Sequence, residues 1–481
     1  MSDPSSSSEV DNSYRDANTA YLADRELRRH ARVLHLWALG VGAVISGDFF
    51  GWNFGLAAAG GFSGMFAALC LMTLMYFGLC FSIAEMAAAL PHTGGAYSFA
   101  RTAMGPWGGY ITGLAENMEY ILTPAVIVVG IGGYLGAIFG TPASTAPLWW
   151  LLCYVLFVAL NIWGVELSFR FSVVITIAAL VVLAVFWIGA IPHMDLARWA
   201  DGGVKWPSSW GSVLGCLPFA LWFYLAIEQL PLAAEESHDP QRDLPRGLLS
   251  GLLTLVFCAF ATLFTSAGIA PGAEAVGKSQ EPLFLGFQTI FGSGVSSRLL
   301  GAVACTGLIA SFHTIIFAYG RQIYSLSRAG YFPSWLSVTH PTRKTPIRAL
   351  VAGAVMGYAA ALAIHLAGQG SAVGAVLINM AVFGAVLAYV AQMGSFLLLR
   401  RKFPKLERPY VSPLGVAGAV FAALVAMLTL GTLFVNPDYN KGVIGAVVWF
   451  VAGIAYFALY ARHRLILAPE EEFARKLNVL P

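Results

Sequence analysis

The sequence predicts an all-α integral membrane protein with twelve transmembrane helices. Two observations carry this prediction: 58% of the 481 residues are hydrophobic while only 11% are charged, and the apolar residues gather in long runs. Soluble domains carry about 25% charged residues, so a chain of this composition has too little polar surface to face water. A soluble enzyme, a disordered chain and a nucleic-acid-binding protein all fit poorly. The net charge of +3 gives no reason to expect a polyanionic partner. The expected surroundings are a lipid bilayer.

Each predicted helix follows from one apolar run, because a bilayer core of about 30 Å needs roughly 20 apolar residues per spanning helix. The runs place spans at 34–58, 63–89, 107–138, 147–165, 169–191, 211–231, 246–270, 299–324, 347–366, 372–399, 413–434 and 443–461. They divide the chain into a tail at 1–33, five spans at 34–191, five more at 211–399, a last pair at 413–461 and a tail at 462–481. The Ser-rich start reads as a disordered tail rather than a cleaved signal peptide, and 21–33 as a short charged helix.

Basic residues are distributed unevenly between the two sides of the predicted membrane. With the N-terminus in the cytoplasm, 23 of the 28 Lys and Arg residues fall on the cytoplasmic side and 5 on the other. The positive-inside rule then places both termini in the cytoplasm. We expect a multi-pass protein of the plasma (cell inner) membrane.

The first and sixth spans are interrupted. Span 1 contains the polar triplet Ser46-Gly47-Asp48, and span 6 contains Glu228 and has a proline at each end. Interrupted segments at matching places in two halves indicate a transporter built from inverted repeats. The pattern therefore predicts two five-helix repeats plus two helices, with helices 1 and 6 broken and the first unwound at Ser46-Gly47. The alternative is two kinked helices without function, since Gly and Pro are common in membrane helices.

Five acidic residues lie within the predicted spans, namely Asp48, Glu85, Glu116, Glu119 and Glu228. A charged side chain inside a membrane costs at least about 2.5–3.5 kcal/mol, so such residues are functional candidates by default. No lysine lies deep in a span. Either some of these acids are protonated or a cation lies among them.

Asp48 and Glu228 lie at the two interruptions, and their surroundings leave two interpretations open. Asp48 caps the half-helix that follows the break, pairs with a substrate ammonium, or does both. Trp222 either packs as an ordinary membrane tryptophan or covers that ammonium through a cation–π contact. Glu228 suits a proton carrier whose charge depends on which side of the membrane is open.

Span 3 carries two acids three residues apart. Glu116 and Tyr120, at i and i+4, share a helix face. Glu116 and Glu119 either hydrogen-bond to neighbouring helices or share a proton or a cation, because two such carboxylates rarely both ionise in apolar surroundings. His313 and His365 lie in later spans, where a lone histidine is more often a packed side chain than a titrating one.

The remaining charges are expected near the membrane surface. Glu85 lies at the cytoplasmic end of span 2, where it is expected to reach loop donors or Arg101, as a structural pair or an inner gate. The acids at 470–472 and the basic run at 400–408 are expected to be solvated or to face lipid headgroups. A P-loop, a nucleophile elbow and a metal-ligand cluster are all missing, and the six cysteines show no disulfide or metal spacing. The sequence thus predicts no enzyme, no cofactor and no bound metal.

Four motifs in order make the chain resemble the amino acid–polyamine–organocation (APC) permease superfamily. They are the segments 40–45, 85–97, 234–245 and 321–333, the last followed by Thr345-Pro346. The resemblance covers about residues 34–460. It implies the leucine-transporter-type 5+5 inverted-repeat fold, with a substrate site between spans 1, 3, 6 and 8. The family often carries a lysine in span 5 in place of a sodium ion; span 5 here has none, so the coupling ion, H⁺ or Na⁺, stays open.

One departure from the family pattern bears on the substrate. Amino acid permeases typically have a Gly-rich triplet at the span 1 break, which holds the α-carboxylate of the substrate, whereas Ser46-Gly47-Asp48 has an acid in the last position. A carboxylate there would repel an α-carboxylate by a few kcal/mol at about 4 Å and an intermediate dielectric. The substrate is therefore expected to be an amine that lacks that group.

The segments 46–55 and 114–124 look like the ethanolamine permease branch. In that resemblance Asp48 binds the ammonium, Trp222 covers it, and Asn53, Glu116 or Tyr120 takes the hydroxyl. Ser46, Gly47, Glu119 and Tyr224 complete the predicted substrate site, and Glu228 is the candidate for proton coupling. The sequence thus predicts a secondary transporter that imports a small amine, ethanolamine first, by alternating access. The alternative is a polyamine or amino acid permease or exchanger of the same fold.

Overall fold

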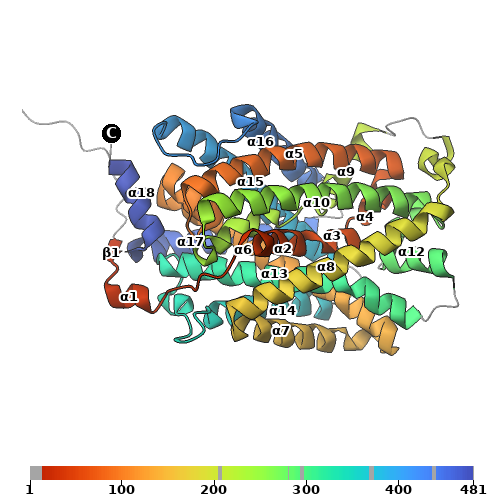
Figure 1. Cartoon of the computed structure of the whole chain (residues 1–481), viewed down its shortest axis with the longest axis horizontal. Coiled ribbons are helices and arrows are strands. Elements are labelled where there is room, and N and C mark those ends of the chain that lie inside the picture. The colour runs from red at the N-terminus through yellow and green to blue at the C-terminus, as the bar shows by residue number, and fades with distance from the viewer. Residues whose placement is uncertain are drawn as a thin grey trace, which may run out of the picture.

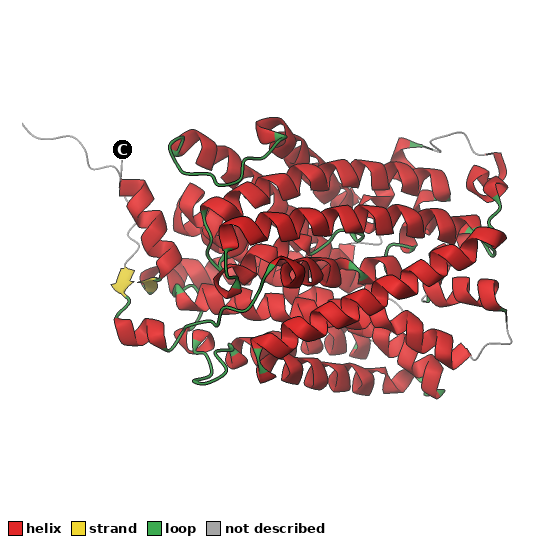
Figure 2. Cartoon of the chain, viewed as in Figure 1, coloured by secondary structure: helices red, strands yellow, loops and turns green. Residues whose placement is uncertain are grey.

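The computed structural model describes residues 14–203, 209–279, 281–292, 297–367, 373–435 and 440–479. They form a bundle whose long helices run roughly along one direction, with a single pair of short strands at one end (Figures 1 and 2). The expectation of an all-helical chain is confirmed. The helices on the outside, such as α8 (Val165–Ala190) and α17 (Asn440–Leu459), expose large apolar side chains including Val174 and Val451, which suits a lipid-facing surface.

Ten helices in the described ranges are long and apolar enough to cross a membrane. They are α5 (Phe62–Ala89), α6 (Gly95–Phe139), α7 (Ala146–Trp163), α8, α10 (Pro240–Gly268), α13 (Ser297–Arg328), α14 (Ile347–Leu366), α15 (Val373–Lys402), α16 (Gly415–Val435) and α17. They match the predicted spans 2 to 5 and 7 to 12. Spans 1 and 6 consist of shorter pieces, so the total of twelve crossings and the inverted repeat remain predictions.

Span 1 breaks later than the sequence indicates. It comprises α2 (Val33–Val44), α3 (Ser46–Phe49) and α4 (Phe54–Ala59), and Ile45 between the first two is still helical. The backbone N–H of Phe50 donates to the carbonyl of Ser46 at 2.9 Å, which carries the helical turn past the polar triplet. The chain becomes extended at Phe50 and left-handed at Gly51, where φ is 97°. The expected unwinding at Ser46-Gly47 is therefore wrong, because the glycine that supplies the irregular backbone is Gly51.

Span 6 is broken between its two prolines. The helix α9 (Trp210–Leu221) ends before Trp222, residues 222–226 form turns, and the 3-10 helix η4 (Ile227–Glu236) follows. Ala226 has a φ of 80°, which is uncommon for a residue with a Cβ. Such backbone persists only where the surrounding structure holds it in place, and it often marks a functional segment.

The helix α6 begins twelve residues before the predicted span and contains a kink. Gly105 has φ 80° and ψ −173°, directly before Pro106. A residue before proline is disfavoured in helical geometry, and glycine alone adopts this positive φ readily. The kink separates a short first segment, which includes Arg101, from the long membrane segment that includes Glu116 and Glu119. The long segment packs against α13 and α15.

The two ends of the described chain meet at one end of the bundle. The strand β1 (Tyr14–Asp16) pairs in parallel with β2 (Leu465–Leu467), and α1 (Thr19–Ala23) and α18 (Pro469–Val479) lie beside them, at the left of Figure 1. We call this the terminal end. Its location in the cytoplasm remains a prediction.

The charged helix expected at 21–33 is wrong, since α1 stops at Ala23. Arg25 turns inward and donates to the carbonyl of Tyr21, the carbonyl of Ser334 and the hydroxyl of Ser337 at 2.9–3.1 Å. These bonds hold the segment against the chain that follows α13. The remaining elements are short: η1 (Ala143–Thr145), η2 (Ile191–His193), η3 (Leu196–Gly203), α11 (Ala273–Lys278), α12 (Pro282–Phe291), η5 (Ser334–Ser337) and η7 (Ala461–His463).

Candidate functional site

The breaks in spans 1 and 6 lie in direct contact. A Cβ placed on Gly47 would lie 2.5 Å from the carbonyl oxygen of Trp222 and 3.2 Å from the Cα of Phe223. A Cβ on Gly51 would meet the indole nitrogen of Trp222 at 2.5 Å. The two glycines therefore let the irregular segments approach at backbone distance. The helix α13 joins them through Ser311, whose hydroxyl accepts from the N–H of Ser46 at 2.9 Å.

Asp48 is buried at this junction, with 1% of its surface exposed. Neither carboxylate oxygen makes a hydrogen bond within the described part of the chain, although Thr262 of α10 lies close enough to interact with it. Asp48 lies in α3, the last turn before the break, so it does not cap the half-helix that follows. The C-terminal end of a helix carries a partial negative charge from its free carbonyl groups, which adds to that of the carboxylate. This junction is thus suited to a cation.

Three other predicted site residues, Asn53, Trp222 and Tyr224, lie around the breaks, and each contacts a different part of the protein. The amide of Asn53 donates to the carbonyls of Val276 and Ser279 at 2.8 and 2.9 Å and accepts from the N–H of Gly51 at 3.1 Å, so it holds the break itself. The Trp222 indole packs on Gly51. The hydroxyl of Tyr224 lies 2.7 Å from that of Thr73 on α5.

The acids of span 3 differ from one another. The carboxylate of Glu116 accepts from Gln322 at 2.8 Å and from Tyr120 at 3.3 Å. Its role as a hydrogen-bonded structural acid therefore has direct support. Glu119 instead lies close enough to Glu228 of η4 to interact with it.

The pair of Glu119 and Glu228 is buried next to two tyrosines. Tyr389 of α15 lies beside Glu228, and its hydroxyl is 2.9 Å from that of Tyr76 on α5. The Tyr76 ring in turn lies 5.0 Å from the ring of Tyr224, whose own neighbours include Asp48. The structure thus arranges the predicted acids as an Asp48 site and a Glu119–Glu228 site with Tyr224 between them. Two adjacent buried carboxylates cannot both carry a full charge without a cation, which makes the second site suited to holding a proton.

Of the two partners expected for Glu85, loop donors or Arg101, the structure shows the loop donors, while Arg101 pairs with Glu471. Glu85 is 2% exposed and accepts from Arg400 at 2.6 and 3.0 Å and from the N–H of Ser412 at 2.8 Å, and it also pairs with Arg408 at 3.0 Å. It therefore fixes the C-terminal end of α15 and the loop that follows. Two members of the basic run at 400–408, expected to be solvated, are instead partly buried partners of this acid.

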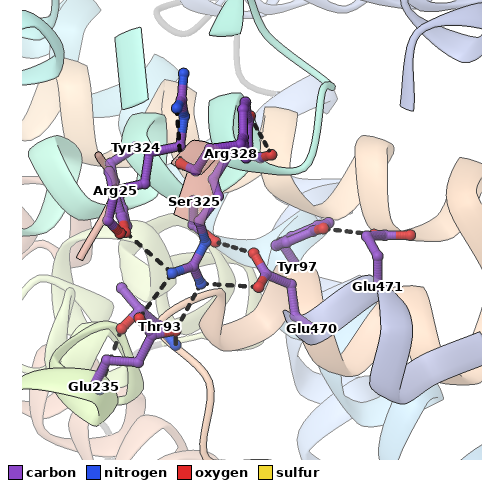
Figure 3. A network of polar contacts seen from close by, with 10 residues as sticks. Arg25, Thr93, Tyr97, Glu235, Tyr324, Ser325, Arg328, Glu470 and Glu471 are labelled. Atoms are coloured by element: carbon purple, nitrogen blue, oxygen red, sulfur yellow. Dashed lines mark hydrogen bonds and ion pairs between the residues drawn. The ribbon is translucent and has the colours of Figure 1, made fainter. Parts of the chain in front are cut away.

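The tail acids were also expected to be solvated, and two of the three are buried. Glu470 is 1% exposed and Glu471 is fully buried. Arg101 donates to Glu471 at 2.5 Å. Arg328 donates to Glu470 at 2.8 Å, as Figure 3 shows. The expectation is wrong because α18 folds back onto the bundle, and sequence patterns do not show that a tail docks.

Arg328 also connects the tail to the segment after the span 6 break. It donates to Glu235 at 2.6 and 2.8 Å, and the neighbouring acid Glu236 pairs with Arg321 at 2.7 Å. Burial opposes ionisation of Glu235, but the adjacent Arg328 guanidinium lowers its pKa. Burial raises the pKa of Glu470, which shares that guanidinium. Sequence reasoning named none of these as site residues, although both arginines and both glutamates lie in the motifs at 234–245 and 321–333.

The histidines and cysteines of the described residues form no metal site or disulfide. His313 is packed between Asn161 and Ser168, at 3.2 and 3.0 Å, as expected for a lone membrane histidine. Within the described ranges, no group of three or more His, Cys, Asp or Glu side chains could hold a metal ion, and the six cysteines are free.

The sequence is similar to known transporters over nearly its whole length. A family model described as amino acid permease matches residues 32–460. An uncharacterized transporter of Rhizobium meliloti (strain 1021) is 30% identical, with 83% of this chain and 86% of that protein covered. The branched-chain amino acid permease BcaP of Bacillus subtilis (strain 168) is 26% identical, with 94% and 97% covered. The methylthioribose transporter of the same organism is 23% identical, with 93% and 97% covered. This chain therefore belongs to the amino acid permease family of the APC superfamily, whose members are multi-pass membrane transporters and not enzymes.

Proposed function

We propose that this permease transports a small organic amine that lacks an α-carboxylate, with ethanolamine as the first candidate. One observation carries the proposal: Asp48 is a buried carboxylate without a hydrogen-bond partner in the described chain, at the point where the two breaks meet. An ionised carboxylate in such a place is costly unless a cation pairs with it. A substrate ammonium would supply that cation.

The electrostatics favour an amine over an amino acid. Two unit charges about 4 Å apart interact by roughly 4 kcal/mol at an effective dielectric constant of 20. Asp48 would attract an ammonium by this amount and repel an α-carboxylate bound equally close. The end of the half-helix that contains Asp48 adds to both effects, because its free carbonyl groups carry negative partial charge.

The second candidate is an amino acid or polyamine permease or exchanger. The comparisons favour it, because one relative is a branched-chain amino acid permease and the family is named for amino acids. None of the three relatives described above is named for ethanolamine, and one of them is an uncharacterized transporter. The relation to a methylthioribose transporter agrees with variation in substrate among similar chains.

Competition in proteoliposomes separates these candidates. Uptake of labelled ethanolamine is measured with excess ethanolamine, putrescine, arginine or leucine as competitors. Asp48→Asn keeps the shape of the side chain and removes its charge, so we expect the KM for ethanolamine to rise by at least about 100-fold, out of roughly 1000-fold for the full 4 kcal/mol. Asp239→Asn, at an exposed surface pair, is the control and should behave as the wild type. Saturable leucine or putrescine uptake without ethanolamine uptake would refute the amine proposal in favour of the second candidate.

We further propose that protons drive the transport through Glu119 and Glu228. The support is their close approach in a buried site away from solvent. An imposed pH gradient should drive accumulation of the substrate, and Glu228→Gln should abolish this response while leaving substrate exchange between equal pools. Accumulation driven only by a Na⁺ gradient would contradict proton coupling.

A further inference from the structure

The helix α18 is docked across the terminal end of the bundle. The parallel pairing of β1 with β2 fixes the chain just before it. Its own apolar residues face the bundle: Ala474 is fully buried, and the ring of Phe473 lies 5.3 Å from that of His92, in the loop between α5 and α6. Glu470 and Glu471, in its first turn, point into the same interface (Figure 3).

Glu471 joins four donors from separate parts of the chain. Its carboxylate accepts from Tyr97 and Arg101 on α6, each at 2.5 Å, from Tyr331 after α13 at 3.1 Å and from Tyr14 of β1 at 3.0 Å. The side chain of Arg101 is 5% exposed, and apart from Glu471 it donates to Tyr14 at 2.6 Å. Removal of Glu471 would therefore leave a nearly buried guanidinium without an acidic partner, which is strongly unfavourable.

Glu470 extends the contact to the span 6 segment. Arg328, with a side chain 4% exposed, donates at once to Glu470 of α18 and to Glu235 at the end of η4. Tyr324 donates to the backbone of Arg25 and accepts from Arg328, which ties in the N-terminal segment. The tail helix thus connects the start of α6 to the end of α13 and, through Arg328, to the end of η4. Glu119 lies on α6 and Glu228 on η4, while α13 contacts the Asp48 site through Ser311.

We propose that α18 is a lock on the terminal end of the transporter, and that Glu470 and Glu471 must leave their partners before this end can open. Alternating access requires the elements around a substrate site to separate first at one end and then at the other. Glu471 joins the start of α6 to Tyr331 after α13, and Glu470 joins α18 to the Arg328 side chain that also binds Glu235 of η4. The start of α6 can therefore separate from the paired ends of α13 and η4 only after these bonds break. The inference rests on the transport activity of the family and is independent of which substrate is carried.

The lock can be tested without substrate by hydrogen–deuterium exchange on the full-length protein in nanodiscs. In the double variant Glu470→Gln and Glu471→Gln, exchange should rise about tenfold in α18, and also in η4 and in residues 95–104 of α6. Glu472→Gln is the matched control: this acid is 54% exposed on the same helix and pairs only with Lys476 among the ion pairs of the described chain. Its exchange should equal that of the wild type in all three segments.

The three segments distinguish the possible results. Faster exchange in α18 with unchanged η4 and 95–104 would show that the helix is an appendage and would overturn the proposal. Unchanged exchange in α18 would show that the carboxylates do not hold it, with the same consequence. If the double variant does not fold, Glu470→Gln alone keeps all four donors to Glu471, and a smaller rise in α18 and η4 is then expected. Because no substrate is present, these outcomes do not depend on the amine proposal.

Discussion

Gly47→Ala tests the contact between the two breaks most directly. The added methyl group would lie 2.5 Å from the carbonyl oxygen of Trp222 and 3.2 Å from the Cα of Phe223. Both are backbone atoms, so they cannot rotate away as a flexible side chain would, and α3 must shift as a whole. Overpacking of this kind costs about 1–3 kcal/mol. The shift would also displace Asp48, the next residue, from its position beside the span 6 break.

The measurement is thermal unfolding in detergent, followed by tryptophan fluorescence and combined with uptake in proteoliposomes. The matched control is Gly133→Ala in α6, where a Cβ would meet nothing within 4 Å. Alanine is favoured over glycine in a helix by up to about 1 kcal/mol, so the control should unfold at the same temperature as the wild type or higher. Gly47→Ala should unfold at a lower temperature and transport more slowly. Equal unfolding temperatures for the two variants would refute the close contact of the breaks.

Two further predictions concern charged groups at the terminal end and near it. Glu85→Gln should lower the free energy of unfolding by about 3–5 kcal/mol, because it leaves the partly buried Arg400 without its acid. Glu274→Gln, at an exposed ion pair, is the control and should leave the free energy of unfolding unchanged. Equal effects of the two substitutions would contradict a structural role for Glu85. Burial lowers the pKa of His92 from 6.5 to about 4, so the unfolded chain binds a proton at this residue between pH 6.5 and 4 while the folded protein does not. Stability should therefore be lost as the pH falls through this window, by up to roughly 3 kcal/mol. In His92→Gln the unfolding temperature should depend less on pH between pH 4 and 7 than it does in the wild type. The same dependence on pH in both proteins would mean that His92 is protonated next to Phe473 in the folded state.

Much of the fold could be predicted because a membrane imposes simple rules on sequence. The apolar runs give ten of the helices within a few residues, apart from the early start of α6. The interruptions in spans 1 and 6 are visible because glycine, proline and acids are costly or disruptive inside an apolar helix. The position of the first break was wrong by about four residues, since both Gly47 and Gly51 permit irregular backbone and packing against Trp222 decides between them.

The candidate site could be predicted only as a set of residues. Composition singles out the acids in the spans, but which of them share a partner depends on how helices pack. Glu116 proves to be bonded to Gln322, more than 200 residues away, while Glu119 faces Glu228. Asn53 has a polar amide of the kind that binds ligands, but its hydrogen bonds instead hold the backbone at the break in span 1.

The sequence by itself determined that this chain spans a membrane and carries acids in two interrupted spans, because the costs of burying charge and of leaving backbone groups unpaired in lipid act on each residue locally. The permease family followed from the resemblance of its motifs. Only the tertiary structure decided the partners of those acids and of the tail. Glu85 binds Arg400 and not Arg101, and Glu470 and Glu471 leave solvent to bind arginines of distant helices. The physical reason is that an ion pair is fixed by distance in space, which the order of residues along the chain does not contain.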